Sequence, residues 1–235
     1  MKKQSKSKIL FVVCAFICIF ALTFTSQKTI LVSGGDLPSS QFVVVIDAGH
    51  GGIDPGGIGI STKVKEADVN LQISKKLEKL LSAAGLTVIM TRENENGLYG
   101  IYTKNYKKID MAKRKEIIEK ANPDVVVSVH INRFSNKSLR GAQAFYDDGN
   151  ELGAALAECV QTEFNSQLEA TKREPSTGNY FMVKCTETAA IIAECGYLSN
   201  EEDERLLQTE AYQNKVAYSI FCGIVRYLSV PNKIA

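Results

Sequence analysis

Four side chains with metal-binding or acid–base chemistry stand where predicted elements begin or end. The chain's two histidines, His50 and His130, each follow a run of β-branched apolar residues. Glu194 follows the apolar segment 190–193, and Glu66 opens a helical pattern after a glycine-rich stretch. Two imidazoles and one carboxylate with an open fourth position form a common catalytic zinc arrangement. A further carboxylate that binds no metal can move a proton, so the four residues are candidates for one hydrolytic site.

Each of these residues also has a simpler interpretation. A lone histidine is often a satisfied polar residue, and Glu66 could merely favour the positive end of its helix dipole. Glu194 could cap a turn or pair with a lysine. Asp47 could be a plain strand-end residue or a partner that orients His50. Spacing alone does not decide between these interpretations.

Strand and helix patterns alternate from residue 42 onward, which predicts a single α/β domain with a mostly parallel sheet covered on both faces. The expected strands are 42–47, 86–90, 125–131, 141–146, 180–183 and 190–193, and the expected helices are 66–84, 109–120, 150–167 and one or two within 201–228. Ligands of such sheets bind beyond the carboxyl ends of the strands. Both histidines and Glu194 follow strands, so we expect them to converge at one edge.

The segment before residue 42 predicts export. Four lysines precede an almost wholly apolar run, residues 9–24, whose length lies between that of a signal-peptide core and that of a full membrane span. Residues 1–24 are therefore expected to be a signal peptide or a membrane anchor, with membrane association through residues 9–24 in the second case. Residues 25–41 have a linker composition, and residues 42–230 are expected to form the catalytic domain.

Composition excludes few functions. The formal net charge is only +2, so no strong field indicates nucleic acid as a partner. The cysteines of the expected domain are widely spaced and give no disulfide framework; they are Cys159, Cys185, Cys195 and Cys222. We interpret most of them as small buried apolar residues.

Five ordered motifs resemble those of the zinc-dependent N-acetylmuramoyl-L-alanine amidases, the amidase-3 family. They are residues 45–56 (VIDAGHGGIDPG), Glu66 with residues 68–71, Thr91-Arg92, residues 128–132 (SVHIN) and residues 194–200 (ECGYLSN). The resemblance runs from about Phe42 to Leu228. It implies a zinc-bound hydrolase with a six-stranded sheet in a three-layer α/β/α domain.

The resemblance also implies roles. His50, Glu66 and His130 match the ligands of one Zn²⁺ ion, and Glu194 matches the catalytic carboxylate. Asp47, Asn132 and Arg114 are expected to contact substrate or to support the ligands. The implied reaction is hydrolysis of the amide between the lactyl group of N-acetylmuramic acid and L-alanine in peptidoglycan.

Two departures from the family pattern leave the ligands untouched. Residues Ile118-Glu119 stand where Ala-Asn is common, and Ala189 or Ala190 stands where proline is common. Residues 147–150 leave no room for the occluding helix that some relatives insert after the fourth strand.

The layout resembles the germination-specific amidases of spore formers, which implies action on cortex peptidoglycan in the exported, extracytoplasmic space, with an activating or stabilising protein partner as a further expectation. Two alternatives remain: a metal-dependent peptidoglycan-binding module without catalysis, and a zinc peptidase that cuts within the stem peptide.

Overall fold

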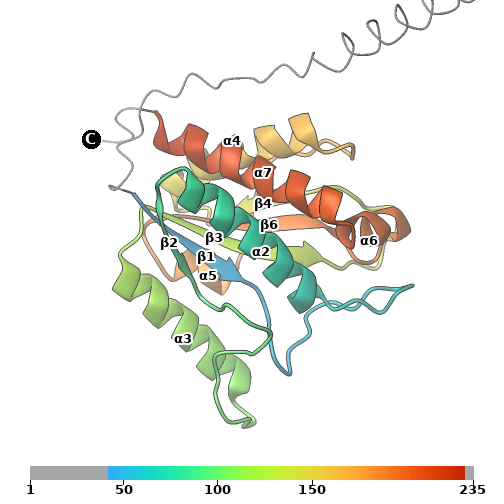
Figure 1. The fold of residues 1–235 in the computed structure, drawn as a ribbon, viewed down its shortest axis with the longest axis horizontal. Coiled ribbons are helices and arrows are strands. Elements are labelled where there is room, and N and C mark those ends of the chain that lie inside the picture. Colours follow the sequence, from blue (N-terminus) through green and yellow to red (C-terminus); the bar gives the residue numbers. More distant parts are fainter. Residues whose placement is uncertain (1–41, 231–235) are drawn as a thin grey trace, which may run out of the picture. The chain divides into compact units, whose positions relative to one another are not determined.

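The computed structural model describes residues 42–230, which form an α/β domain (Figure 1). The expected signal peptide or anchor, 1–24, and the linker, 25–41, lie outside the described residues. The strands are β1 (Val43–Ala48), β2 (Thr87–Met90), β3 (Val125–Asn132), β4 (Gln143–Tyr146), β5 (Ser176–Thr177) and β6 (Ala189–Tyr197). The helices are α2 (Glu66–Ala83), α3 (Tyr106–Ala121), α4 (Glu151–Gln167), α5 (Phe181–Lys184), α6 (Glu201–Leu207) and α7 (Glu210–Leu228).

The six strands form one sheet in the order β2-β1-β3-β6-β4-β5. All neighbouring pairs are parallel except β4 with β6, which is antiparallel. The prediction of a mostly parallel, six-stranded sheet is therefore confirmed. The central strands β1, β3 and β6 read as near-continuous apolar runs because helices cover both of their faces.

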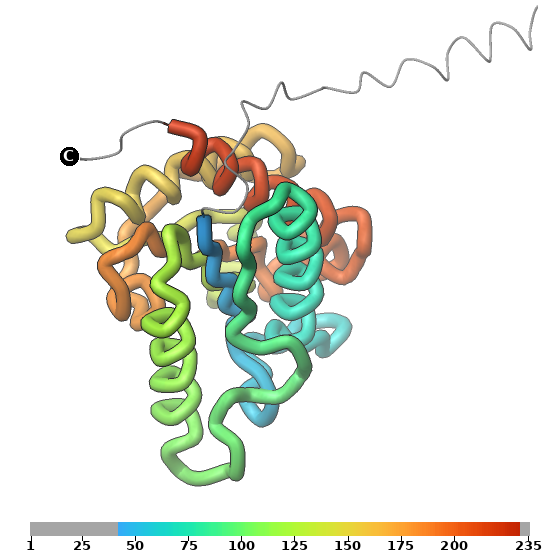
Figure 2. Tube along the Cα trace, turned by 60° about the vertical axis from the view of Figure 1, so that its left-hand side comes forward, coloured from blue at the N-terminus to red at the C-terminus, as the bar shows by residue number. Residues whose placement is uncertain are grey.

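Helices form a layer on each face of the sheet, as Figure 1 shows. On one face α2, α4 and α7 pack over the larger core, and on the other α3 and α5 cover a smaller one. The turned view of Figure 2 shows α2 and α3 on opposite sides of β1. The predicted three-layer architecture is thus the observed one.

Alternation along the strands assigns each side chain to a core. Val44 and Ile46 belong to the larger core, whereas Val45 between them belongs to the smaller one. By the same period of two, polar residues on alternate positions of β1, β3 and β6 face the side covered by α3 and α5. This parity matters for the site, because it places several polar strand-end residues on one face.

The predicted strand 180–183 is wrong. Residues Phe181–Lys184 form the single-turn helix α5, and the edge strand β5 lies earlier, at Ser176–Thr177. A short apolar run does not distinguish a strand from a buried helical turn. Met182 and Val183 pack into the smaller core beside β6, which a helical turn achieves without adding a strand.

The other differences are small. Helix α3 begins at Tyr106, three residues before the expected start, and the segment 201–228 is divided into α6 and α7. The four cysteines within the described residues form no disulfide with one another; Cys195 is buried, whereas the other three are only half-buried. Among residues 42–230, no helix combines the length and apolarity that crossing a membrane requires.

We predict that Gly223→Ala destabilises the fold although alanine is the better helix former. A Cβ at Gly223 would lie 2.6 Å from the Cα of Val160, so α7 could no longer approach α4 as closely. Overpacking of this kind costs about 1–3 kcal/mol, which exceeds the helix-propensity gain of roughly 1 kcal/mol. Urea denaturation measures the difference.

Asn214→Ala, on the exposed side of the same helix, is the matched control and should leave the free energy of unfolding unchanged or raise it slightly. A Gly223→Ala protein as stable as that control would contradict the close packing of α7 on α4.

Candidate metal centre and active site

The candidate residues converge at the carboxyl ends of three neighbouring parallel strands. His130 on β3 pairs in register with Glu194 on β6, and Asp47 near the end of β1 pairs with Ser128 on β3. All four side chains face α3 and α5. Each lies an even number of positions from a residue of the smaller core on the same strand, and such residues point to the same face of the sheet. Glu66 reaches the same edge as the first residue of α2.

Three of these residues form a cluster that could hold a metal ion. Glu66 Oε1 lies 3.2 Å from His50 Nε2 and 2.9 Å from His130 Nδ1. One ligand atom from each residue lies within 4.8 Å of the other two. The three predicted ligands are therefore brought together, although 64 positions separate Glu66 from His130.

Two backbone donors and one side-chain donor hold the Glu66 carboxylate in place. Gly57 N donates to Oε2 at 2.6 Å, Ile131 N donates to Oε1 at 3.2 Å, and Asn70 Nδ2 donates to Oε1 at 3.3 Å. Burial would raise the pKa of Glu66, but its hydrogen bonds and charge interactions with His130 and His50 hold that pKa far below the ordinary value. Glu66 is therefore an ionised, positioned carboxylate, as a metal ligand must be.

Glycines leave room for the ligand side chains. A Cβ at Gly49 would lie 2.3 Å from the His130 ring, and a Cβ at Gly56 would lie 2.5 Å from Glu66 Oε2. Gly56 also has a φ of +65°, a conformation that glycine adopts readily. The glycine-rich stretch thus lets backbone pass directly beside the ligands.

Asp54 orients His50. Its Oδ2 lies 3.1 Å from His50 Nδ1, which leaves Nε2 facing Glu66. Burial would lower the pKa of His50, but contact with Glu66 and Asp54 raises it. We did not assign Asp54 from the sequence. The available signal was an acidic residue four positions after a candidate ligand, because carboxylates commonly orient ligand histidines.

Two buried arginines fix the backbone that carries His50. Arg92 donates to the carbonyls of Ala48 and Gly49, and Arg114 donates to those of Ala48 and His50, at 2.6–2.9 Å. His50 has a φ of 62°, which is uncommon for a residue with a side chain. The guanidinium groups hold this conformation, and these contacts favour a supporting role for Arg114, which stays a prediction.

Asp47 anchors this arginine network and does not contact the His50 ring directly. Its carboxylate accepts from Arg114, Thr91 and Ser128. Arg114 in turn reaches the His50 carbonyl. Asp47 therefore influences His50 through Arg114 and the backbone. The carboxylate that contacts the His50 ring is that of Asp54.

Glu194 is buried beside the cluster without a hydrogen-bond partner for one oxygen. Its side chain is 8% exposed, and Oε2 has no partner within the described part of the chain. Burial raises the pKa of Glu194 to about 7; interaction with His130 opposes this rise, and the charge of Glu66 adds to it. An unsatisfied buried carboxylate is costly, and groups with such a pKa cluster at functional sites.

Asn132 lies two residues beyond His130, at the irregularity where β3 and β6 shift register. Its backbone carbonyl accepts from Leu198 N at 2.9 Å. This contact ties the end of β3 to the segment that follows Glu194. A direct contact of the Asn132 side chain with substrate stays a prediction.

Comparison with known proteins identifies the family. The sequence profile of the amidase-3 family, described as N-acetylmuramoyl-L-alanine amidase, matches residues 44–226. The chain belongs to this family. Its members are hydrolases, and the enzyme is an N-acetylmuramoyl-L-alanine amidase. All four candidate residues fall within the matched region.

The chain is similar to amidases from Bacillus, Clostridioides and Paenibacillus. It is 36% identical over 198 residues to the germination-specific N-acetylmuramoyl-L-alanine amidase of Bacillus subtilis, covering 82% of each chain. It superposes with a TM-score of 0.77 on the CwlD amidase of Clostridioides difficile, solved in complex with the GerS lipoprotein, at 36% identity over 80% of this chain and 98% of that one. The CwlV catalytic domain of Bacillus (Paenibacillus) polymyxa superposes with a TM-score of 0.71 at 33% identity, over 80% of this chain and 99% of that one.

We predict that Arg114→Lys weakens both the fold and the metal cluster. One ammonium group cannot serve Asp47, Asp110 and two carbonyls in the directions that the guanidinium does. Breaking a buried ion pair costs about 3 kcal/mol, and loss of ligand support lowers metal affinity roughly tenfold or more. Urea denaturation and calorimetric titration with Zn²⁺ measure the two effects.

Lys113→Gln, an exposed cation on the same helix, is the control and should change stability by less than about 0.5 kcal/mol. If Arg114→Lys binds Zn²⁺ as tightly as the control, the proposed support of His50 by Arg114 is wrong.

We also predict an acid-sensitive contribution from Asp47. Burial would raise its pKa, but Arg114, Ser128 and Thr91 lower it from 3.8 to about 2. The ionised group therefore stabilises the fold above pH 4, and this contribution is lost as the pH falls from about 4 towards 2. Between pH 5 and pH 2 the parent protein should lose roughly 2 kcal/mol more unfolding free energy than Asp47→Asn does.

Urea denaturation at a series of pH values measures the two slopes. Asp148→Asn removes an exposed carboxylate and should keep the parent slope. Parallel curves for the parent and Asp47→Asn would show that Asp47 is not held in its ionised form.

Proposed function

We propose that this protein is a zinc-dependent amidase of spore-cortex peptidoglycan. It hydrolyses the amide between the lactyl group of N-acetylmuramic acid and L-alanine of the stem peptide. The observation that carries the proposal is the unpaired, buried Glu194 carboxylate next to the cluster of His50, Glu66 and His130. A metal-binding module without catalysis would have no use for so costly a fourth group.

The donor set fits zinc. Two imidazoles and an ionised carboxylate suit a borderline metal, and three protein ligands leave one position for water or substrate. His50 and His130 also line a cavity, so a substrate that enters it can approach these two residues. When bound, the zinc ion supplies Lewis-acid chemistry that polarises the scissile carbonyl and acidifies water.

The protein's own residues position the reactants and move the proton. Glu194, with a pKa near 7, is matched to accept a proton from the attacking water and to return it to the departing amine of L-alanine. Asp54 fixes the His50 ring, while Arg114 and Arg92 fix its backbone. Such support keeps the reacting groups in place before substrate arrives.

Two similar proteins support the biological setting. One similar amidase is germination-specific, and another was solved with a lipoprotein. We propose that this chain acts outside the cytoplasm on cortex peptidoglycan, that residues 1–24 export or anchor it, and that a protein partner supports its activity.

We predict that Glu194→Gln lowers kcat by a factor of roughly a thousand while zinc content stays at one ion per chain. The amide keeps the shape of the carboxylate but cannot accept the proton, and general acid–base catalysis contributes about 10²–10⁴-fold. The assay measures release of stem peptides from purified cortex peptidoglycan by mass spectrometry, with zinc content measured on the same samples.

Glu187→Gln, which alters an exposed carboxylate just before β6, is the control and should match the parent rate. Full activity in Glu194→Gln would refute its role in proton transfer. Products cut within the stem peptide would instead favour a zinc peptidase, and no cleavage by the zinc-loaded parent would favour a binding module.

A further inference from the structure

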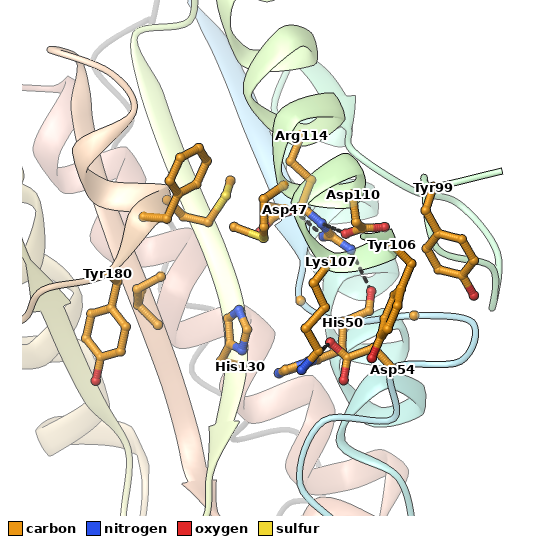
Figure 3. A pocket seen from close by; sticks show the side chains of 16 residues that line it. Asp47, His50, Asp54, Tyr99, Tyr106, Lys107, Asp110, Arg114, His130 and Tyr180 are labelled. Atoms are coloured by element: carbon orange, nitrogen blue, oxygen red, sulfur yellow. Dashed lines mark hydrogen bonds and ion pairs between the residues drawn. The ribbon is translucent and has the colours of Figure 1, made fainter. Parts of the chain in front are cut away.

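A cavity of about 260 Å³ extends from the metal cluster between α3 and α5. His50 and His130 stand at one end, and Figure 3 shows Tyr106 and Lys107 on the wall opposite His130 and Tyr180. Most of its surface is apolar; the walls include Tyr106, Met111, Tyr180, Phe181, Met182 and Ile192. The cavity therefore suits a small, partly apolar segment of substrate next to the reacting bond.

Charges on the cavity wall leave one cation available. Asp47, Asp110 and Arg114 also line the cavity, but they are buried and paired with one another. Lys107 has a side chain that is 65% exposed, and its ion pair is with Asp54 Oδ2 at 3.5 Å, which is longer than a hydrogen bond. Its ammonium group can therefore exchange this loose contact for one with an anion that enters the cavity.

We propose that this cavity receives the first residues of the stem peptide and that Lys107 pairs with the free α-carboxylate of the second residue. This inference rests on the proposed amidase function. In peptidoglycan the second residue is a D-glutamate linked through its side-chain carboxyl group, so its α-carboxylate is free unless the cell amidates it. Lys107 would then make the enzyme prefer the unamidated peptide.

The distances support this assignment. Each residue of an extended peptide spans about 3.5 Å, so the α-carboxylate of the second residue lies roughly 7 Å beyond the scissile bond. Two successive contacts, of 3.1 Å and 3.5 Å, separate the His50 ring from Lys107 Nζ through Asp54. These contacts bring the ammonium group within a distance of the His50 ring comparable to that reach, and the apolar residues of the cavity suit the L-alanine methyl group.

A second cation, Arg133, would meet the carboxylate if the peptide lay in the opposite direction, so it serves as a test of that direction. Arg133 is exposed and lies close to Gly57, whose backbone N–H donates to Glu66 Oε2. It does not line this cavity. If the peptide ran in the opposite direction, Arg133 rather than Lys107 would meet the carboxylate.

The experiment uses two disaccharide tetrapeptides that differ only at the second residue, with a carboxylate in one and a carboxamide in the other. Steady-state rates of the zinc-loaded protein are compared for the parent, Lys107→Gln, Arg133→Gln and the neighbouring exposed Lys108→Gln. For the carboxylate substrate, Lys107→Gln should raise KM about three- to tenfold with little change in kcat, as for a partly exposed ion pair. For the carboxamide substrate KM should not change.

Lys107→Glu should reverse the preference, and added salt should weaken the preference of the parent. Equal effects of Lys107→Gln on both substrates would overturn the inference, because Lys107 would then act only through Asp54 on His50. A preference that survives Lys107→Gln but disappears in Arg133→Gln would also overturn it. Cleavage of neither substrate by the parent would instead refute the proposed function itself.

Discussion

The structure depends on how two buried arginines hold three consecutive carbonyls. Arg92 and Arg114 together occupy the carbonyls of Ala48, Gly49 and His50, just where β1 leaves the sheet. Backbone carbonyls at this depth need donors, and no strand continues there to supply them. The arginines therefore satisfy the end of β1 and hold His50 in its unusual conformation. Asp47 and Asp110 neutralise Arg114, so the same network also determines how acid affects stability.

The ends of the parallel strands position the other residues of the site. Because β1, β3 and β6 are neighbours, their carboxyl ends lie side by side, and alternation places His130 and Glu194 on the same face. Helix α2 contributes Glu66 from its first turn, where backbone N–H groups of Gly57 and Ile131 are available to the carboxylate. The result is a cluster built from elements whose own cores are rigid, which suits a site that must hold its geometry.

Much of this was predictable from residue patterns. The β-branched runs ending in His50 and His130 and the helix beginning at Glu66 predicted the strand-end convergence, and the structure brings the three residues together. The segment 180–183 was not predictable, because four apolar residues satisfy a strand and a helical turn equally. Asp54 and Lys107 were also missed. Their importance comes from the path of the glycine-rich loop and of the segment before α3, which local patterns do not specify.

The acid–base role proposed for Glu194 requires a burial that lowers the stability of the fold. Its neighbours on β6 are apolar, and a residue such as alanine there would satisfy the strand without burying an unpaired oxygen. The same burial that makes the carboxylate unfavourable brings its pKa close to neutrality, where a group can both accept and return a proton. Asp47 and Glu66, by contrast, have partners that hold them ionised. Glu194 therefore differs from these two ionised carboxylates because its Oε2 meets no donor within the described part of the chain.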